Sequence, residues 1–242
     1  MPRTADMPGP AGTGRAMTLL LADARLPTGA HVHSGGMEQA VDDAVVTDLE
    51  SLVPFLHGRL MTGGRLCAHA AAMACTLAAR RDGEPTEADW RPLDEEITAR
   101  IVSPALRATS RRQGRSLLRT GAALYVQSPL HALDAVAPGG PHLAVVQGAL
   151  AHHGGIGPHD AALIAAYGSV TSPASAALRL LGLDPLSVSA ALARLAPAID
   201  QLATEAARHA FEGPDALPSP ASPLSDLLGD RHAGREERLF AS

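Results

Sequence analysis

Apolar residues recur at spacings of three and four over most of this chain, which is the pattern of amphipathic helices. The longest run lies within residues 158–181, and a second run of about five turns occupies residues 185–206. No stretch of useful length alternates apolar and polar residues, and the sequence contains no internal repeat. The pattern therefore predicts an all-α chain with short connections, in which consecutive helices pack antiparallel.

Several predicted helices begin at a side chain that can accept hydrogen bonds from the first free backbone N–H groups. The predicted caps are Ser34, Thr47, Thr86 with Asp89 as a capping box, Ser103 before Pro104, and Asp184 before Pro185. Glycine pairs are expected to end helices, at Gly63-Gly64 and, after His152-His153, at Gly154-Gly155. Pro173 is expected to kink the helix predicted to begin at Pro158.

These elements predict one helical bundle of about eight to ten helices over residues 17–213. Residues 1–16 are rich in Pro and Gly and are expected to be disordered. A boundary falls at Gly213-Pro214, and residues 214–242 form a proline-containing, charged tail that ends in Leu239 and Phe240. Such a tail has little core in which to bury its apolar residues, so we expect it to become ordered by docking on a partner.

The composition excludes several classes of protein. All 20 basic residues are arginine, so a Walker A loop, a pyridoxal-phosphate Schiff base and a Ser-x-x-Lys nucleophile cannot be built. The two cysteines cannot supply a thiolate zinc cage. A net charge of −5 with 2% aromatic residues disfavours nucleic acid. No apolar run reaches the length of a membrane span and no signal-peptide core is present, so we expect a cytoplasmic protein.

The segment from Leu20 to Glu38 is the most distinctive part of the chain, and it could be an active site, a metal site or a docking surface. His33 and Ser34 are adjacent, which is poor geometry for a base and its nucleophile, and Ser34 is better explained as a helix cap. His31 and His33 are weak candidates for transient metal binding, because two imidazoles leave a metal site incomplete.

One arginine recurs every fourth residue within residues 107–119, which places a basic stripe on one helical face. The stripe consists of Arg107, Arg111, Arg115 and Arg119. It is either a solvated face that keeps an alanine-rich protein soluble or a surface for an acidic partner or a phosphate, since guanidinium groups suit both anions.

The chain resembles the urease accessory protein F (UreF) family from about residue 18 to its C-terminus. The most specific parts are the segment Asp23…Leu26-Pro27-x-Gly29-Ala30-His31-x-His33-Ser34-x-Gly36-Met37-Glu38 and the ending Arg238-Leu239-Phe240-Ala241-Ser242. Weaker matches are Gln113-Gly114-Arg115-Ser116-Leu117-Leu118-Arg119, Pro141-His142, Gln147-Gly148-Ala149 and Ala177-Leu178-Arg179-Leu180. The chain departs from the family at His31, where relatives carry an aromatic residue, and at Leu181-Gly182-Leu183-Asp184.

The resemblance implies an all-α homodimer that is not an enzyme. It also implies binding to UreD (also called UreH), recruitment of the GTPase UreG, and nickel delivery to apo-urease, with nickel in transit and no tightly bound cofactor. The partner-binding residues that we expect are Asp23, Pro27, Gly29, His31, His33, Ser34, Gly36, Glu38, Arg115, Arg179, Arg238, Leu239 and Phe240. Two alternatives remain open: a metal-dependent enzyme using His31, His33 and Glu38, and a regulator of GTP hydrolysis by UreG that uses Arg238 or the basic stripe.

Overall fold

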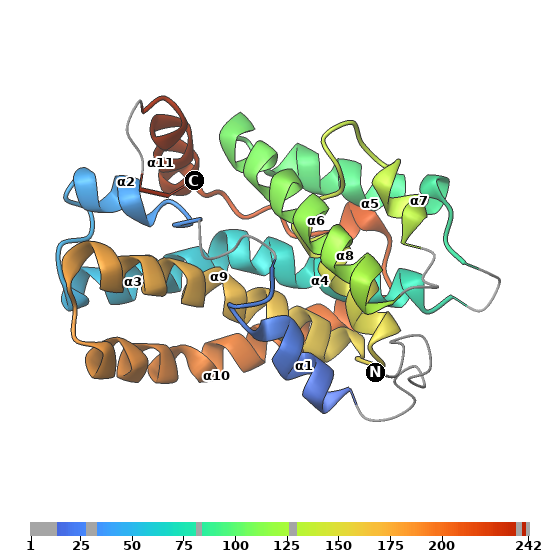
Figure 1. Ribbon diagram of the computed structural model, residues 1–242, viewed down its shortest axis with the longest axis horizontal. Helices are drawn as coiled ribbons and strands as arrows, with labels where there is room; N and C mark the ends of the chain where they lie inside the picture. The colour runs from blue at the N-terminus through green and yellow to red at the C-terminus, as the bar shows by residue number, and fades with distance from the viewer. Residues whose placement is uncertain (1–13, 28–32, 81–83, 126–129, 236–238, 241–242) are drawn as a thin grey trace, which may run out of the picture.

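The computed structural model describes residues 14–27, 33–80, 84–125, 130–235 and 239–240. Their secondary structure is helical, with no strand among these residues, which confirms the all-α prediction (Figure 1). In chain order the α-helices are α1 (Arg15–Ala22), α2 (Met37–Asp42), α3 (Leu49–Arg59), α4 (Arg65–Ala78), α5 (Glu87–Arg100), α6 (Pro104–Leu124), α7 (His131–Asp134), α8 (Leu143–His153), α9 (Pro158–Leu181), α10 (Pro185–His209) and α11 (Pro223–Ala233). A π-helical turn (Leu60–Gly64) joins α3 to α4, and a 3₁₀ turn (Pro214–Ala216) precedes α11.

Helix α4 lies at the centre of the bundle, where it packs against α8, α9 and α10. The α4–α8 contact is close because Gly148 faces the α4 backbone: a Cβ atom at this position would lie 2.2 Å from the carbonyl oxygen of Ala71. One part of the core joins α3, α4, α9 and α10, and another joins α4, α5, α6 and α8. Alanine and leucine supply most of this packing, as expected for a chain with few aromatic residues.

Most predicted helix starts are confirmed. Ser103 accepts a hydrogen bond from the Leu106 N–H at 3.1 Å, and Asp184 accepts from the Ser187 N–H at 2.9 Å. Thr86 and Asp89 form the predicted capping box. Helix α8 ends at His153 and is followed by Gly154-Gly155, as predicted.

Three local predictions are wrong. Asp48, rather than Thr47, caps α3, because its carboxylate accepts the Ser51 N–H at 2.8 Å. Ser34 is not a helix cap, since α2 begins three residues later, after Gly36. Gly63-Gly64 does not break the helix, because the chain passes through it as a π-helical turn that continues into α4. Gly64 packs there against Ser169: a Cβ atom at position 64 would lie 2.6 Å from Oγ of Ser169.

The described part of the C-terminal tail packs on the bundle of its own chain. Arg100 on α5 donates hydrogen bonds to the carbonyl oxygens of Asp215 and Leu217, at 3.0 and 2.9 Å. Helix α11 lies against α2 and α6 (Figure 1). The tail thus finds core within the chain, because Leu228 on the inner face of α11 and Phe240 both join the bundle's buried apolar cluster. Whether it also docks on a partner stays a prediction.

Helix α9 is long and apolar enough, by length and composition alone, to cross a membrane. More than half of its most apolar window is buried inside the bundle, where it packs against α4, α8 and α10. Its apolar character is accounted for by this central position in the core.

Candidate partner-binding site

The segment before α2 is shaped by two glycines in the left-handed backbone region. Gly35 has a φ of 63° and Gly36 has a φ of 86°, and residues with a Cβ atom rarely adopt such values. Gly35 also lies against the guanidinium of Arg59: a Cβ atom at position 35 would lie 3.1 Å from Nη2 of Arg59. These two residues turn the chain from the buried Ser34 into α2 and direct Glu38 inward.

Glu38 holds the C-terminal end of the described chain. Its two carboxylate oxygens accept the backbone N–H groups of Leu239 at 2.7 Å and Phe240 at 3.1 Å. We call residues 239–240 the C-terminal strap. Glu38 is only 3% exposed, so these bonds form away from bulk water, where a carboxylate without partners would be strongly destabilised. Residues 201 positions apart in the sequence are thereby joined at one point.

The two side chains of the strap point in opposite directions. Phe240 is buried in the bundle's core, and the guanidinium carbon of Arg179 on α9 lies 4.4 Å from the centre of its ring, in cation–π geometry. Leu239 is 82% exposed. The structure therefore brings together Glu38, Arg179, Leu239 and Phe240, four of the residues predicted from the sequence.

His232 on the inner face of α11 belongs to the same cluster and was not predicted. Its imidazole is 2% exposed, and its Nδ1 atom lies 3.7 Å from a carboxylate oxygen of Glu38. Neither ring nitrogen has a hydrogen-bond partner in the structure. Its sequence spacing could have revealed it, because His232 follows Leu228 by four residues and so shares the inward face of α11.

Polar contacts on both flanks hold α11 against the bundle. Asp226 accepts the Ser103 N–H at 3.1 Å on the α6 side, and Arg231 pairs with Asp43 of α2 at 2.8 Å. Besides these charged side chains, α11 presents Leu224 and Leu227 to solvent, and they are 46% and 56% exposed.

The predicted site residues that precede the glycine turn lie partly against α6. The carbonyl oxygen of Pro27 accepts hydrogen bonds from the hydroxyls of Ser116 and Thr120, at 3.1 and 3.0 Å. Asp23 instead pairs locally with Arg25, whose guanidinium lowers the pKa of Asp23 to about 2. Gly29, His31 and Arg238 lie outside the described residues.

The four arginines of the predicted basic stripe divide into two pairs. Arg107 donates to the carbonyl oxygens of Ile101 and Val102, and Arg111 pairs with Asp94 at 2.8 Å, so these two serve the fold. Arg115 and Arg119 are exposed, and the aliphatic part of Arg115 lies against Gly140. Only the second half of the stripe is therefore presented to solvent.

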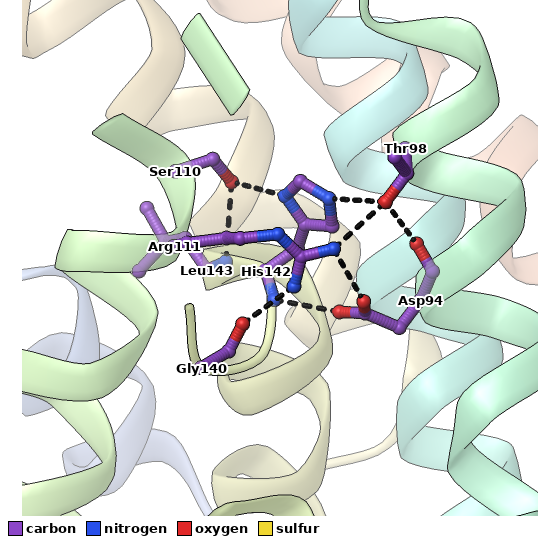
Figure 2. Close-up of polar contacts among 7 residues, drawn as sticks. All are labelled: Asp94, Thr98, Ser110, Arg111, Gly140, His142 and Leu143. Carbon is purple, nitrogen blue, oxygen red and sulfur yellow. Dashed lines mark hydrogen bonds and ion pairs between the residues drawn. The ribbon is translucent and has the colours of Figure 1, made fainter. Parts of the chain in front are cut away.

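A buried polar network surrounds His142 (Figure 2). Asp94 accepts the His142 backbone N–H at 2.8 Å, while the imidazole hydrogen-bonds with Thr98 at 3.0 Å and Ser110 at 2.9 Å. Desolvation by burial, with a smaller opposing effect of Asp94, lowers the pKa of His142 to about 4. The neutral imidazole thus ties α5 and α6 to the start of α8, a structural role within the fold.

The other histidines do not assemble a metal centre in the part of the chain that the structure describes. There, no three histidine, cysteine, aspartate or glutamate side chains form a group that could hold a metal ion. His33 is buried. His152 and His153 sit at the end of α8, where desolvation lowers the pKa of both, and His159 lies at the start of α9 beside Asp160. Glu38, the carboxylate residue in the alternative of a metal-dependent enzyme, instead accepts hydrogen bonds from the two backbone N–H groups of the strap.

Comparison with known proteins identifies the family. A family model described as UreF matches residues 46–196, which is more than half of the chain. The chain belongs to the UreF family. It is 41% identical over 227 residues to the urease accessory protein UreF of Mycolicibacterium vanbaalenii, covering 94% of this chain and 98% of that protein. The protein of the same name from Mycobacterium marinum is 42% identical over 230 residues, covering 95% of this chain and all of the relative.

Membership of the UreF family places this chain in urease maturation. The relatives are named accessory proteins, which agrees with a role other than catalysis. The match to the relatives from M. vanbaalenii and M. marinum spans nearly the full chain, so it extends beyond the residues of the family model to include segments on both sides.

Proposed function

We propose that this UreF-family chain is a scaffold that binds UreD (UreH) and recruits the GTPase UreG, so that nickel reaches apo-urease. The observation that carries the proposal is the outer face of α11. This helix lies in the segment expected to dock on UreD, and it presents two exposed leucines while its charged side chains contact its own bundle. An apolar face on a helix held in place by polar contacts suits a protein partner.

The surface proposed for UreG and the nickel path ends at Glu38 in α2, and α2 packs against α11. This surface consists of the loop from Leu26 to Glu38 together with Arg238. Glu38 links this loop to the C-terminal strap, so that a partner on α11 and a partner on the loop would contact neighbouring parts of one surface. Nickel in this scheme is cargo that passes between partners, and no residue of this chain is assigned as its resident ligand.

A capture experiment tests α11 as the docking surface for UreD. The variant Leu224→Asp/Leu227→Asp places two charges on the outer face without touching the buried side of the helix. We expect UreD capture to weaken about tenfold or more, since each buried leucine contributes about 1.5–3 kcal/mol. The matched control is Leu186→Asp, which changes a leucine that is 79% exposed on α10. Equal UreD affinity of the double variant and the wild type would contradict this proposal.

A second candidate function is regulation of GTP hydrolysis by UreG, favoured by the two exposed arginines, Arg115 and Arg119, one turn apart on α6. Guanidinium groups stabilise the charge that develops on a transferring phosphoryl group. Arg115→Ala, Arg119→Ala and Arg238→Ala would each be compared with wild type in a UreG hydrolysis assay. A stimulated rate that one of these changes abolishes favours regulation, whereas an unchanged rate leaves the chain a scaffold.

Two further expectations belong to this proposal. The chain is expected to form a homodimer in the cytoplasm, and its solution mass alone and with UreD would establish whether the dimer precedes the complex. The metal-dependent enzyme is the less favoured alternative, because both carboxylate oxygens of Glu38 accept backbone N–H groups of the strap.

A further inference from the structure

The imidazole of His232 is an unusual feature of the bundle. It is almost fully buried, and both of its nitrogens lack a hydrogen-bond partner in the structure. A buried polar group left in this way destabilises a fold, whereas an apolar side chain of similar size would not. Since buried polar groups are normally paired, this exception calls for an explanation beyond packing.

The neighbour that explains it is Glu38. The Nδ1 atom of His232 lies 3.7 Å from Oε2 of Glu38, beyond a good hydrogen bond but within the range of an ion pair. The same carboxylate accepts the two N–H groups of the strap. A buried carboxylate that accepts amide N–H groups is stabilised further when the imidazole beside it carries a positive charge.

The other charged groups near α11 have partners of their own. At the end of α2, Asp42 pairs with Arg235, and Asp43, the residue after the helix, pairs with Arg231. On the α6 side, Asp226 and Asp230 accept hydrogen bonds from Ser103, and Arg107 of α6 binds backbone carbonyl groups. Arg179 of α9 lies over the ring of Phe240. His232 is thus the titratable group of α11 whose charge most directly alters the environment of Glu38.

We propose that His232 and Glu38 form a proton-operated latch that holds the C-terminal strap. With a proton on His232, the pair is a buried ion pair and the strap stays seated. Loss of that proton leaves Glu38 as a buried charge without its cationic neighbour, so the carboxylate gains by becoming solvated and the strap is released. The strap is therefore held more weakly when the imidazole is neutral than when it is charged.

Release of the strap uncovers two groups at the inner face of α11. The carboxylate of Glu38 becomes available to donors of another molecule, and the side chain of Phe240 leaves the core. The latch thus controls a surface next to the segment predicted for partner binding. The inference concerns only contacts within this chain, so it stands or falls independently of whether UreD or UreG binds.

The full-length chain offers a simple reporter of the latch, because it contains only three phenylalanines. Labelling with ¹⁵N-phenylalanine gives three amide signals, and Phe240→Leu identifies the one from the strap. Solvent exchange of the Phe240 amide, normalised to its intrinsic rate, measures the seated fraction. We expect its protection to fall about tenfold or more as the pH is raised and His232 becomes neutral, while that of the Phe55 amide on α3 stays constant.

Two variants and one control variant decide the cause. His232→Leu keeps the inner face of α11 apolar and should make Phe240 protection independent of pH, whereas His57→Leu, at an exposed histidine, should retain the wild-type profile. Glu38→Gln should lower protection at all pH values, because the amide oxygen accepts only one of the two N–H groups well. Protection that does not change with pH in the wild type, or that changes equally in His232→Leu, would overturn the latch.

Discussion

Asp94 shows how much a single buried side chain does in this molecule. One carboxylate oxygen accepts the His142 N–H and the other pairs with Arg111, while the hydroxyl of Thr98 lies between Arg111 and the imidazole (Figure 2). Three helices meet through this one carboxylate, so its loss leaves a buried guanidinium and a buried N–H group without their partner.

We therefore expect Asp94→Ala to lower the free energy of unfolding by about 3–5 kcal/mol, the usual effect of removing one partner of a buried ion pair. Glu95→Ala is the matched control, because Glu95 is the adjacent acidic residue and is exposed. Urea unfolding of both variants measures the effect. Equal stability of Asp94→Ala and Glu95→Ala would show that the network contributes little to the fold.

His142 predicts a pH dependence of stability. Its pKa is about 4 in the folded chain and about 6.5 when unfolded, so the unfolded state binds more protons between these values. Stability is complete above about pH 6.5 and is lost as the pH falls towards 4, by about 3 kcal/mol in total. In urea unfolding at several pH values, His142→Asn should remove this part of the dependence, and His57→Asn should retain it.

Little of this network could be predicted from the sequence. Asp94 and His142 are 48 residues apart, and an aspartate followed by two glutamates on a predicted helix looks solvent-exposed until the packing of α5 against the α6–α8 region is known. Arg111 was assigned to a basic stripe that is either solvated or binds a partner, whereas it pairs with Asp94 inside the fold, and this partner depends on tertiary packing. The spacing of His232 from Leu228 indicates an inward position, but its neighbour Glu38 lies on another element and could not be predicted.

At the scale of elements, the sequence predicted correctly the helix starts that depend on residues next to one another in the chain. The starts of α6 and α10 follow from a capping side chain followed by proline, and the start of α5 follows from its capping box. The errors occurred where two neighbouring residues compete or where packing overrides propensity. Thr47 and Asp48 are both good caps, and Gly63-Gly64 is held in a helical turn by its contact with α9.

The close approach of α4 and α8 predicts opposite effects of the same substitution at two glycines. Gly148→Ala places a methyl group against the α4 backbone, so the helices must separate, which destabilises the fold by about 1–3 kcal/mol. Gly168→Ala on α9 meets nothing within 4 Å and should stabilise the fold by about 0.5–1 kcal/mol through helix propensity. Thermal unfolding should therefore shift in opposite directions, and equal shifts would contradict the packing of α4 on α8.

At the scale of the whole molecule, the chain folds its C-terminal segment back over α2 and α6 and anchors its end on Glu38 (Figure 1). The sequence suggested a tail without a core, because the inner residues Leu228 and Phe240 are separated by charged residues and have few apolar neighbours in sequence. Their partners come from distant helices. The result is one surface formed by α2, α11 and the strap, and this surface is where we place the partners of urease maturation.

The chain belongs to urease maturation, and the role that we propose for it there is nickel insertion. The most direct test of this role is urease activity and nickel content in cells that produce apo-urease, UreD and UreG, in the presence of nickel, with or without this chain. We expect urease to carry nickel and to be active only when the chain is present. Urease that gains the same nickel content and activity without the chain would contradict the account.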